Sequence, residues 1–446
     1  MEGKDLTKGN LLKNMTILLI PLILTNLLNS IYNIVDSIWI GNLIGENGVS
    51  AVTNSYPITL ILTSITAGIA TAVSVSVAQH YGAKDEEKTK SIVGASYLIG
   101  IIVAIISAIL MKISIKFWLK LINTPEEILG ITIEYLNFYI IGYIFNFIFI
   151  IIMEEFRAIG NTKTPMIFVA LSSGLNLLLD PILIKLGLGV KGAAIATLIS
   201  MFIGLVLAIT YAKRKSQLLK VDFKYIKFRK EYIFQLLKIG IPVIIQEWAI
   251  AMVFFLEVNT SNEAGVIGSA GYGIVNKLEE ILHIICGAFK TMMVVTVGQF
   301  IGNNMIKETK NIMKQGLKLS IAPILITIII VYIFPKQFCR IFVSSENVIT
   351  MSILYISVLR FSLLLIPFRQ LLQGFIIGTG HTKFSMIQTF ITMGVEIVSL
   401  LFLKNYTNME GLVALGIAIT ICVIVQLSIN TIYYFSNKWQ RKVITK

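Results

Sequence analysis

The chain has 446 residues, of which 56% are hydrophobic and only 14% are charged, and its formal net charge is +14. A soluble domain carries charge on about a quarter of its residues, so this composition excludes an ordinary soluble protein and indicates an integral membrane protein. We assign the excess of basic residues to membrane topology and expect no nucleic-acid partner. The three cysteines form no CxxC pair, so neither a disulfide framework nor a cysteine metal site is expected.

Twelve apolar segments follow one another along the chain. Each is long enough to cross a bilayer, because a helix of about 20 apolar residues spans it. Lipid offers no hydrogen-bond partner to backbone groups, which favours helices. We therefore predict an all-α integral membrane protein with twelve transmembrane helices. The predicted segments lie near residues 15–40, 50–78, 92–111, 131–153, 166–186, 192–212, 239–260, 265–299, 317–335, 349–376, 384–403 and 411–436.

The loops between these segments differ in charge, which predicts their side of the membrane. Most of the 38 Lys and Arg residues lie in the N-terminal segment, the even-numbered loops and the C-terminal tail. Because basic loops stay in the cytoplasm, we expect a multi-pass protein of the plasma membrane with both termini cytoplasmic. The most basic stretch, "AKRKSQLLKVDFKYIKFRKEY" at residues 212–232, is predicted to be a linker that rests on anionic lipid headgroups.

The two halves of the chain resemble each other. The stretch "VAQHYGAKDEEKTK" at residues 77–90 aligns with "VGQFIGNNMIKETK" at residues 297–310, and Pro21 aligns with Pro242. Six helices per half give both halves the same orientation in the membrane, so we predict a parallel internal repeat, with a substrate site between the halves. The expected organisation is an N-terminal six-helix lobe at residues 1–211, a basic linker at 212–232 and a C-terminal six-helix lobe at 233–446.

Several motifs occur in order along the chain. They are Pro21 with Asp36, a Gln-x-x-Gly motif after the second and eighth segments, "RAIGNTKTP", "NLLLDP" and "GVKGAAIAT". In these features the sequence resembles the multidrug and toxic compound extrusion (MATE) family over nearly its full length. The resemblance implies two lobes around a central cavity, alternating access, and export of organic cations driven by a proton or sodium gradient. Small organic cations and membrane lipid are the expected partners, and we expect function as a monomer.

The first segment carries polar side chains on one helical face. Asn26, Asn29, Asn33 and Asp36 are spaced three or four residues apart, and the opposite positions hold Leu, Ile and Val. An unpaired carboxylate inside a membrane costs on the order of 2.5–3.5 kcal/mol, so this face should line the protein interior or a wet cavity. Asp36 is expected to bind the coupling cation, with a purely structural hydrogen bond to a neighbouring helix as the alternative.

Further oxygen-bearing side chains follow in the fifth and sixth segments. Asn176 and Asp180 lie four residues apart on one helical face, and the resemblance implies that they belong to a cation site. Thr197 is expected to complete this set, in which Asp36, Asn176 and Asp180 are also candidate ligands for Na⁺. The alternative for Asp180 is a helix break before Pro181. The residues expected to line the substrate path in this half are Tyr32, Asn33 and Asn146.

The second half places acidic residues at related positions. Glu257 corresponds to Asp36 in the repeat. Glu396 corresponds to Asn176. A second cation or drug site is therefore a hypothesis for this half, with simple solvation as the alternative for Glu257. Its candidate residues are Glu247, Glu257, Glu279, Glu280 and Glu396, and those for a flexible drug-binding surface, or for core packing, are Met252 and Met292.

Two other functions are compatible with parts of the sequence. A flippase for lipid-linked saccharides, from the same superfamily, would have a more cationic cavity. Four basic residues within the segments keep this alternative open: Lys277, Lys290, Arg360 and Arg369. The spacing of Lys277 and Glu280, however, predicts a self-neutralising pair. An enzyme is not expected, because the chain lacks P-loop, HExxH and GxSxG motifs, and no cofactor is predicted besides the coupling H⁺ or Na⁺.

Overall fold

The computed structural model describes residues 3–220, 224–407, 409–441 and 444, so residues 221–223 of the expected linker lie outside the described residues. All regular secondary structure in the described residues is helical, and the predicted all-α class is confirmed. The α-helices are α1 (Leu11–Leu43), α2 (Glu46–Gly82), α3 (Glu86–Leu121), α4 (Glu126–Ala158), α5 (Lys163–Leu183), α6 (Gly189–Lys215), α7 (Lys230–Glu263), α8 (Gly265–Gly302), α9 (Thr309–Leu319), α10 (Ile321–Ile328), α11 (Pro335–Arg340), α12 (Glu346–Gly378), α13 (Thr382–Tyr406) and α14 (Gly411–Phe435). Short helical turns lie at Ile184–Leu188, Ile306–Glu308, Ile329–Ile333 and Lys438–Gln440.

Helices account for all twelve predicted crossings. Eleven continuous helical stretches in the described residues are long and apolar enough to cross a membrane, and one of them, Lys163–Lys215, has 53 residues. Gly187 and Gly189 inside it have φ angles of 86° and 53°, a left-handed geometry that glycine adopts readily, and the chain reverses there. Gly204 of α6 lies against Ser172 of α5, so the two helices form an antiparallel hairpin and supply two crossings.

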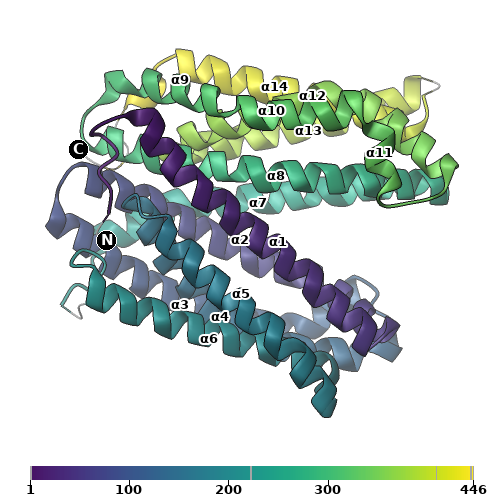
Figure 1. Cartoon of the computed structure of the whole chain (residues 1–446), viewed down its shortest axis with the longest axis horizontal. Helices are drawn as coiled ribbons and strands as arrows, with labels where there is room; N and C mark the ends of the chain where they lie inside the picture. Colours follow the sequence, from purple (N-terminus) through teal and green to yellow (C-terminus); the bar gives the residue numbers. More distant parts are fainter. Residues whose placement is uncertain (1–2, 221–223, 408, 442–443, 445–446) are drawn as a thin grey trace.

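Figure 1 shows two groups of helices, α2–α6 on one side and α7–α14 on the other, with α1 crossing between them. Helix α1 packs against α5 of the first group and α8 of the second. A hydrophobic cluster around Met15 and Leu18 of α1 also contains Phe289 of α8, Phe375 of α12 and Trp439 near the C-terminus. Helix α1 is therefore packed into both groups, and any movement of one group against the other must involve it.

The two groups touch at the end of the bundle that carries both termini, which we call the terminal end (Figure 1). Gln79 of α2 donates from Nε2 to the Gly378 carbonyl of α12 at 2.9 Å. Gln299 of α8 donates from Nε2 to the Ala158 carbonyl of α4, also at 2.9 Å. Donors and acceptors are each related by the same 220-residue offset. The internal repeat has thus produced two matching bonds, which we call the glutamine clasp.

Two glycines let α2 and α8 meet at backbone distance beside the clasp. A Cβ atom on Gly82 would lie 2.1 Å from the carbonyl oxygen of Gln299. One on Gly302 would lie 1.9 Å from the carbonyl oxygen of Gln79. Any side chain would force the backbones apart, so the close approach requires glycine at both positions. The repeated Gln-x-x-Gly motif therefore marks the contact at the terminal end, and the helix groups diverge toward the opposite end (Figure 1).

Candidate functional site

The carboxyl groups of Asp36 on α1 and Asp180 on α5 meet within hydrogen-bonding reach of each other. Asp180 is fully buried, and Asp36 Oδ1 is buried without a partner among the described atoms. Two carboxylates this close repel each other unless a proton or another cation lies between them. In the part of the chain that the structure describes, no Lys or Arg forms an ion pair with either acid. We call these two residues the N-lobe acid pair.

Asn176, Thr197 and Tyr32 surround the N-lobe acid pair. With the Asn176 amide oriented by its neighbours, its nitrogen donates to Asp180 Oδ2 at 2.8 Å. Its oxygen then accepts from the Thr197 backbone nitrogen at 3.1 Å. The Tyr32 hydroxyl lies 3.4 Å from Thr197 Oγ1. Helices α1, α5 and α6 thus bring the four residues predicted for cation coupling, together with Tyr32, into one cluster.

Sequence patterns did not single out Tyr135 and Tyr139 of α4, which border this cluster. Their rings stack with centroids 6.0 Å apart, and Tyr135 lies within electrostatic range of Asp36 and Asp180. Aromatic residues are frequent along apolar membrane helices, so the only available signal was their spacing of four residues on one helical face. With Tyr32 they form an aromatic wall beside the acid pair, and aromatic rings attract organic cations.

Helix α1 exposes two opposite faces of different chemistry. Asn29 and Asn33 are exposed on the polar face that also carries Asp36. Asn26, on the same face, donates from Nδ2 to the Ile284 carbonyl of α8 at 2.9 Å. Only the other face suits lipid, so the polar face with Asn33 points away from it. The apolar residues exposed on that other face are Ile17, Ile20, Leu24, Leu27, Ile31, Ile34 and Ile38.

A second acid pair lies in the C-terminal half. The carboxyl groups of Glu257 on α7 and Glu396 on α13 are within hydrogen-bonding reach of each other, and the Tyr272 hydroxyl donates to Glu257 Oε2 at 2.9 Å. Glu257 takes the place of Asp36 in the repeat. Glu396 takes the place of Asn176. In the N-lobe acid pair the second acid is Asp180, which lies one helical turn after Asn176. We call Glu257 and Glu396 the C-lobe acid pair.

A basic residue lies beside the C-lobe acid pair. Arg369 of α12 is within electrostatic range of Glu279 and Glu396 and donates from Nη2 to His283 Nε2 at 2.8 Å. Since a guanidinium only donates, His283 accepts there and donates its Nδ1 proton to the Glu279 carbonyl at 2.8 Å. His283 is therefore neutral. Arg369 supplies an internal positive charge to the carboxylates of Glu279 and Glu396, which distinguishes this cluster from the N-lobe acid pair.

Two acidic candidates lie apart from both pairs. Glu280 is exposed and forms an ion pair with Lys277 at 2.8 Å, which is the self-neutralising pair that their spacing predicts. Glu247 is half-buried on α7, ten residues before Glu257, which corresponds to about 15 Å along a helix. The structure therefore does not bring Glu247 or Glu280 into the C-lobe cluster with the other three glutamates.

The remaining candidates differ in exposure. Met252 is 68% exposed, whereas Met292 is fully buried in the hydrophobic cluster that joins α1 to α8 and α12. Met292 therefore belongs to the hydrophobic core, which is the alternative role given for it above, and it lines no surface in this conformation. Asn146 is half-buried on α4. Arg360 is exposed over the Tyr332 ring, with its guanidinium 5.5 Å from the ring centroid, so it lies outside the acidic cluster.

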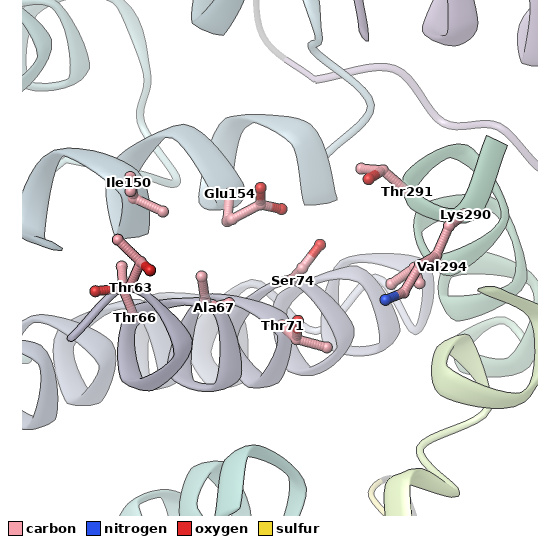
Figure 2. Close-up of a pocket in the computed structure, with 11 residues that line it drawn as sticks. Thr63, Thr66, Ala67, Thr71, Ser74, Ile150, Glu154, Lys290, Thr291 and Val294 are labelled. Atoms are coloured by element: carbon pink, nitrogen blue, oxygen red, sulfur yellow. The ribbon is translucent and has the colours of Figure 1, made fainter. Parts of the chain in front are cut away.

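A cavity of about 270 Å³ lies between α2, α4 and α8, where the two groups of helices face each other. Figure 2 shows Glu154 of α4 across from small polar side chains of α2, with Lys290 and Thr291 of α8 beside them. Glu154 also forms an ion pair with Arg157. The cavity wall is thus rich in hydroxyl groups and carries charges of both signs.

A buried acid that follows Glu154 in the sequence was also missed by the sequence patterns. Glu155 of α4 is fully buried, and its carboxylate accepts from the Ser96 hydroxyl at 2.5 Å and from the Tyr97 hydroxyl at 3.1 Å. It lies just beyond the predicted end of its segment near residue 153, where an acid is expected to be solvated. Because hydroxyl groups of α3 satisfy both oxygens, Glu155 ties α3 to α4.

Comparisons with known proteins place this arrangement in a family. The sequence model of the MatE family matches residues 21–182 and, a second time, residues 242–402. The probable multidrug resistance protein YoeA of Bacillus subtilis is 27% identical and aligns over 99% of this chain and 96% of its own length. The multidrug export protein MepA of Staphylococcus aureus is 28% identical over 89% of this chain and 88% of its own length.

Solved structures share the fold. One is described as an outward-facing conformation of a multidrug resistance MATE family transporter of the MOP superfamily. It has a TM-score of 0.90 and 22% identity, covering 98% of this chain and 99% of that chain. Another, described as MATE in the straight conformation, has a TM-score of 0.91 and 21% identity, covering 99% of this chain and 100% of that chain. Because the family model matches both halves, this chain belongs to the MATE family of membrane transporters.

Proposed function

We propose that this chain is a cation-coupled antiporter that exports organic cations by alternating access between its two lobes. The proposal rests on the N-lobe acid pair, two carboxyl groups that lie within hydrogen-bonding reach of each other beside an aromatic wall. Two carboxylates this close cannot both stay ionised without a cation. The pair therefore binds one positive charge at a time, and competition for it exchanges one cation for another. The names of the multidrug export relatives support drugs as cargo, and the acid pair favours those that carry a positive charge.

The closeness of the two carboxyl groups favours a proton as the coupling ion. One proton between Asp36 and Asp180 would remove their mutual repulsion without any further ligand. Sodium is the second candidate, because Asp36, Asn176 and Asp180 would supply oxygen ligands of the kind that hard cations prefer. In either case the ion acts as a transported substrate, and the chain's own residues provide the binding oxygens.

Helix α1 links cation binding to movement of the lobes. Asp36 lies on α1, Asp180 lies on α5, and α1 also packs against α8 of the other group. A cation between the two acids holds α1 against α5, and its loss leaves two negative charges that repel each other. Occupancy shifts the conformational equilibrium to the extent that the two conformations differ in cation affinity. The C-lobe acid pair, with Glu279 beside it, is the proposed second cation site.

The charge of the interior supports a cationic cargo over the flippase alternative. Lys277 is neutralised by Glu280, and Arg360 is exposed outside the cluster. Lys290 shares the wall of the cavity with the acidic Glu154. Arg369 lies near two carboxylates, Glu279 and Glu396, so its surroundings are acidic overall. An anionic lipid-linked saccharide would meet repulsion at both acid pairs.

The distribution of basic residues supports a cytoplasmic position for the terminal end, in a chain that works as a monomer in the plasma membrane. The glutamine clasp would then close the cytoplasmic side. In that orientation the present conformation is the one that exposes the substrate path to the outside.

Proteoliposomes loaded with a fluorescent cationic dye test the proposal, with proton and sodium gradients imposed separately. We expect one gradient to drive dye transport, and we expect Asp36→Asn and Asp180→Asn each to reduce it at least about 10-fold, because each removes a charge of the cation site. Glu134→Gln is the matched control, since Glu134 is exposed and pairs with Lys191 at 3.0 Å. Failure of both gradients with the unmodified protein, or normal transport by Asp36→Asn, would contradict the proposal.

A further inference from the structure

Three cationic side chains share a hollow where α6 ends. Lys213, Arg214 and Lys220, together with Ile209 and Thr210, surround a space of about 480 Å³. All three cations are exposed. Among the residues that the structure describes, no carboxylate forms an ion pair with any of them. The hollow therefore concentrates positive charge without its own counter-ion in the described part of the chain.

The chain folds back after α6 and holds the third cation in place. The Leu219 backbone nitrogen donates to Ser216 Oγ at 3.1 Å, which closes a turn. The Leu219 side chain is fully buried in the core of the N-terminal half. This anchor keeps Lys220 beside Lys213 and Arg214. The three charges are thus brought together by the fold and are not merely neighbours on one helical turn.

An apolar strip on α6 leads directly into this hollow. Positions spaced three and four residues apart share a helical face, so the side chains at 203, 206, 210 and 213 line up, as do those at 207, 210 and 214. The exposed apolar residues of the strip are Phe202, Ile203, Val206 and Leu207. One face of α6 therefore passes from exposed hydrocarbon to exposed positive charge within about two helical turns.

We propose that this face of α6 is a binding site for one anionic phospholipid. Its acyl chains lie along the apolar strip, and its phosphate accepts hydrogen bonds from Lys213, Arg214 and Lys220. Arginine and lysine bind phosphate oxygens through charge-assisted bonds, and basic pockets at the edge of a membrane domain favour anionic headgroups. A phosphatidylcholine headgroup carries its own positive charge, which the three cations repel, so the site selects for net negative charge.

Basic residues occur at many helix ends in membrane proteins, so the chain's own α9 provides the control. Lys310, Lys314 and Lys318 are also three exposed cations, but they lie along a single helical face without a folded-back partner. Replacing either set with glutamine removes the same formal charge. A difference between the two variants therefore reports the arrangement of the cations and not their number.

The experiment is native mass spectrometry of the purified full-length protein in detergent, titrated with phosphatidylglycerol or with phosphatidylcholine. We expect the Lys213→Gln/Arg214→Gln/Lys220→Gln variant to lose at least about 10-fold in affinity for the first phosphatidylglycerol. The Lys310→Gln/Lys314→Gln/Lys318→Gln variant should change less than about 2-fold, and phosphatidylcholine should bind weakly to all forms. A Lys213→Arg/Lys220→Arg variant keeps the charge and should bind as the unmodified protein does.

Three results would overturn the proposal. Equal losses in the two triple variants would show that only total charge matters. Equal affinity for the two lipids would remove the selectivity. Full displacement of phosphatidylglycerol by inorganic phosphate would show that the site binds a free anion and that the apolar strip contributes nothing. Dye transport does not enter this test, so its outcome is independent of the function proposed above.

Discussion

Gln79 and Gln299 make the same hydrogen bond from opposite halves of the chain, each with its Nε2 atom 2.9 Å from a backbone carbonyl in the other half. The acceptors, Gly378 and Ala158, are related by the same repeat offset as the donors. Leaving a buried acceptor without its donor costs about 1–3 kcal/mol. The clasp therefore contributes substantially to the stability of the conformation in which the terminal end is closed.

Removing one half of the clasp should open the terminal end. We expect Gln79→Leu and Gln299→Leu each to shift the equilibrium toward the open form by about 5-fold or more, because each leaves one buried carbonyl unpaired. Gln299→Leu also removes the acceptor of the Leu6 backbone nitrogen. Distances between spin labels at the exposed positions Glu86 and Lys310 measure the two populations. Gln315→Leu is the control, since the Gln315 amide bonds only within α9, to Asn311 at 2.9 Å. Unchanged distances in both clasp variants would contradict the assignment.

The close contact at Gly302 predicts a larger effect on transport. In Gly302→Ala the new methyl group would lie 1.9 Å from the Gln79 carbonyl oxygen, so α2 and α8 must separate, and transport should fall strongly. Gly130→Ala is a matched control in α4, because a Cβ atom there meets nothing within 4 Å, and alanine favours the helix by about 1 kcal/mol. Dye transport and thermal unfolding in detergent measure both effects. Wild-type behaviour of Gly302→Ala would mean that the helices do not need this close approach.

Arg369 should stabilise the C-terminal half through its charge. Arg369→Gln leaves Glu279 and Glu396 without a nearby cation, which costs about 3 kcal/mol for fully buried groups and less here because Arg369 is half-buried. We expect a lower unfolding temperature, recovered in large part by the double variant Arg369→Gln/Glu279→Gln. If the double variant is no more stable than Arg369→Gln, the arginine acts through packing and not through charge.

Tyr135 should contribute to cargo binding through its ring. Tyr135→Ala removes a cation–π contact worth about 0.5–2 kcal/mol, so the dissociation constant of a cationic dye should rise about 2- to 30-fold. Tyr135→Phe keeps the ring and should show a much smaller change. Tyr406→Ala, at an exposed position of α13, serves as the control. Fluorescence polarisation of the dye measures the affinity, and equal affinities for all variants would exclude Tyr135 from the site.

The helices and their repetition could be predicted from the sequence because hydropathy and motif spacing are local properties. Hydropathy alone does not locate every turn. In the 53-residue stretch that contains α5 and α6, apolar character continues through the turn, and the positive φ angles of Gly187 and Gly189 mark the reversal. Asp36 was expected to need a polar environment because a carboxylate is costly inside a membrane, whereas its grouping with Asn176 and Asp180 followed from the resemblance to the MATE family.

The partners of other residues could not be predicted, because they depend on tertiary structure. Nothing in the repeat indicates that Glu257 pairs with Glu396 one helical turn from the N-lobe arrangement. The Gln-x-x-Gly motif was visible as a landmark, yet the acceptors of Gln79 and Gln299 are backbone carbonyls, which leave no trace in side-chain patterns. Glu155 was missed because hydroxyl groups from another helix allow an acid to be buried where the sequence suggests solvation.

The chemistry of the glutamine clasp determines which conditions can change its strength. Its donors are amides and its acceptors are peptide carbonyls, so the two bonds contain no titratable atom and no net charge. Acidification, ionic strength and membrane voltage therefore leave their strength unchanged. Under the proposed function, sensing of the gradient depends on the carboxyl groups of the acid pairs, whereas closure of the terminal end depends on amide groups and peptide carbonyls.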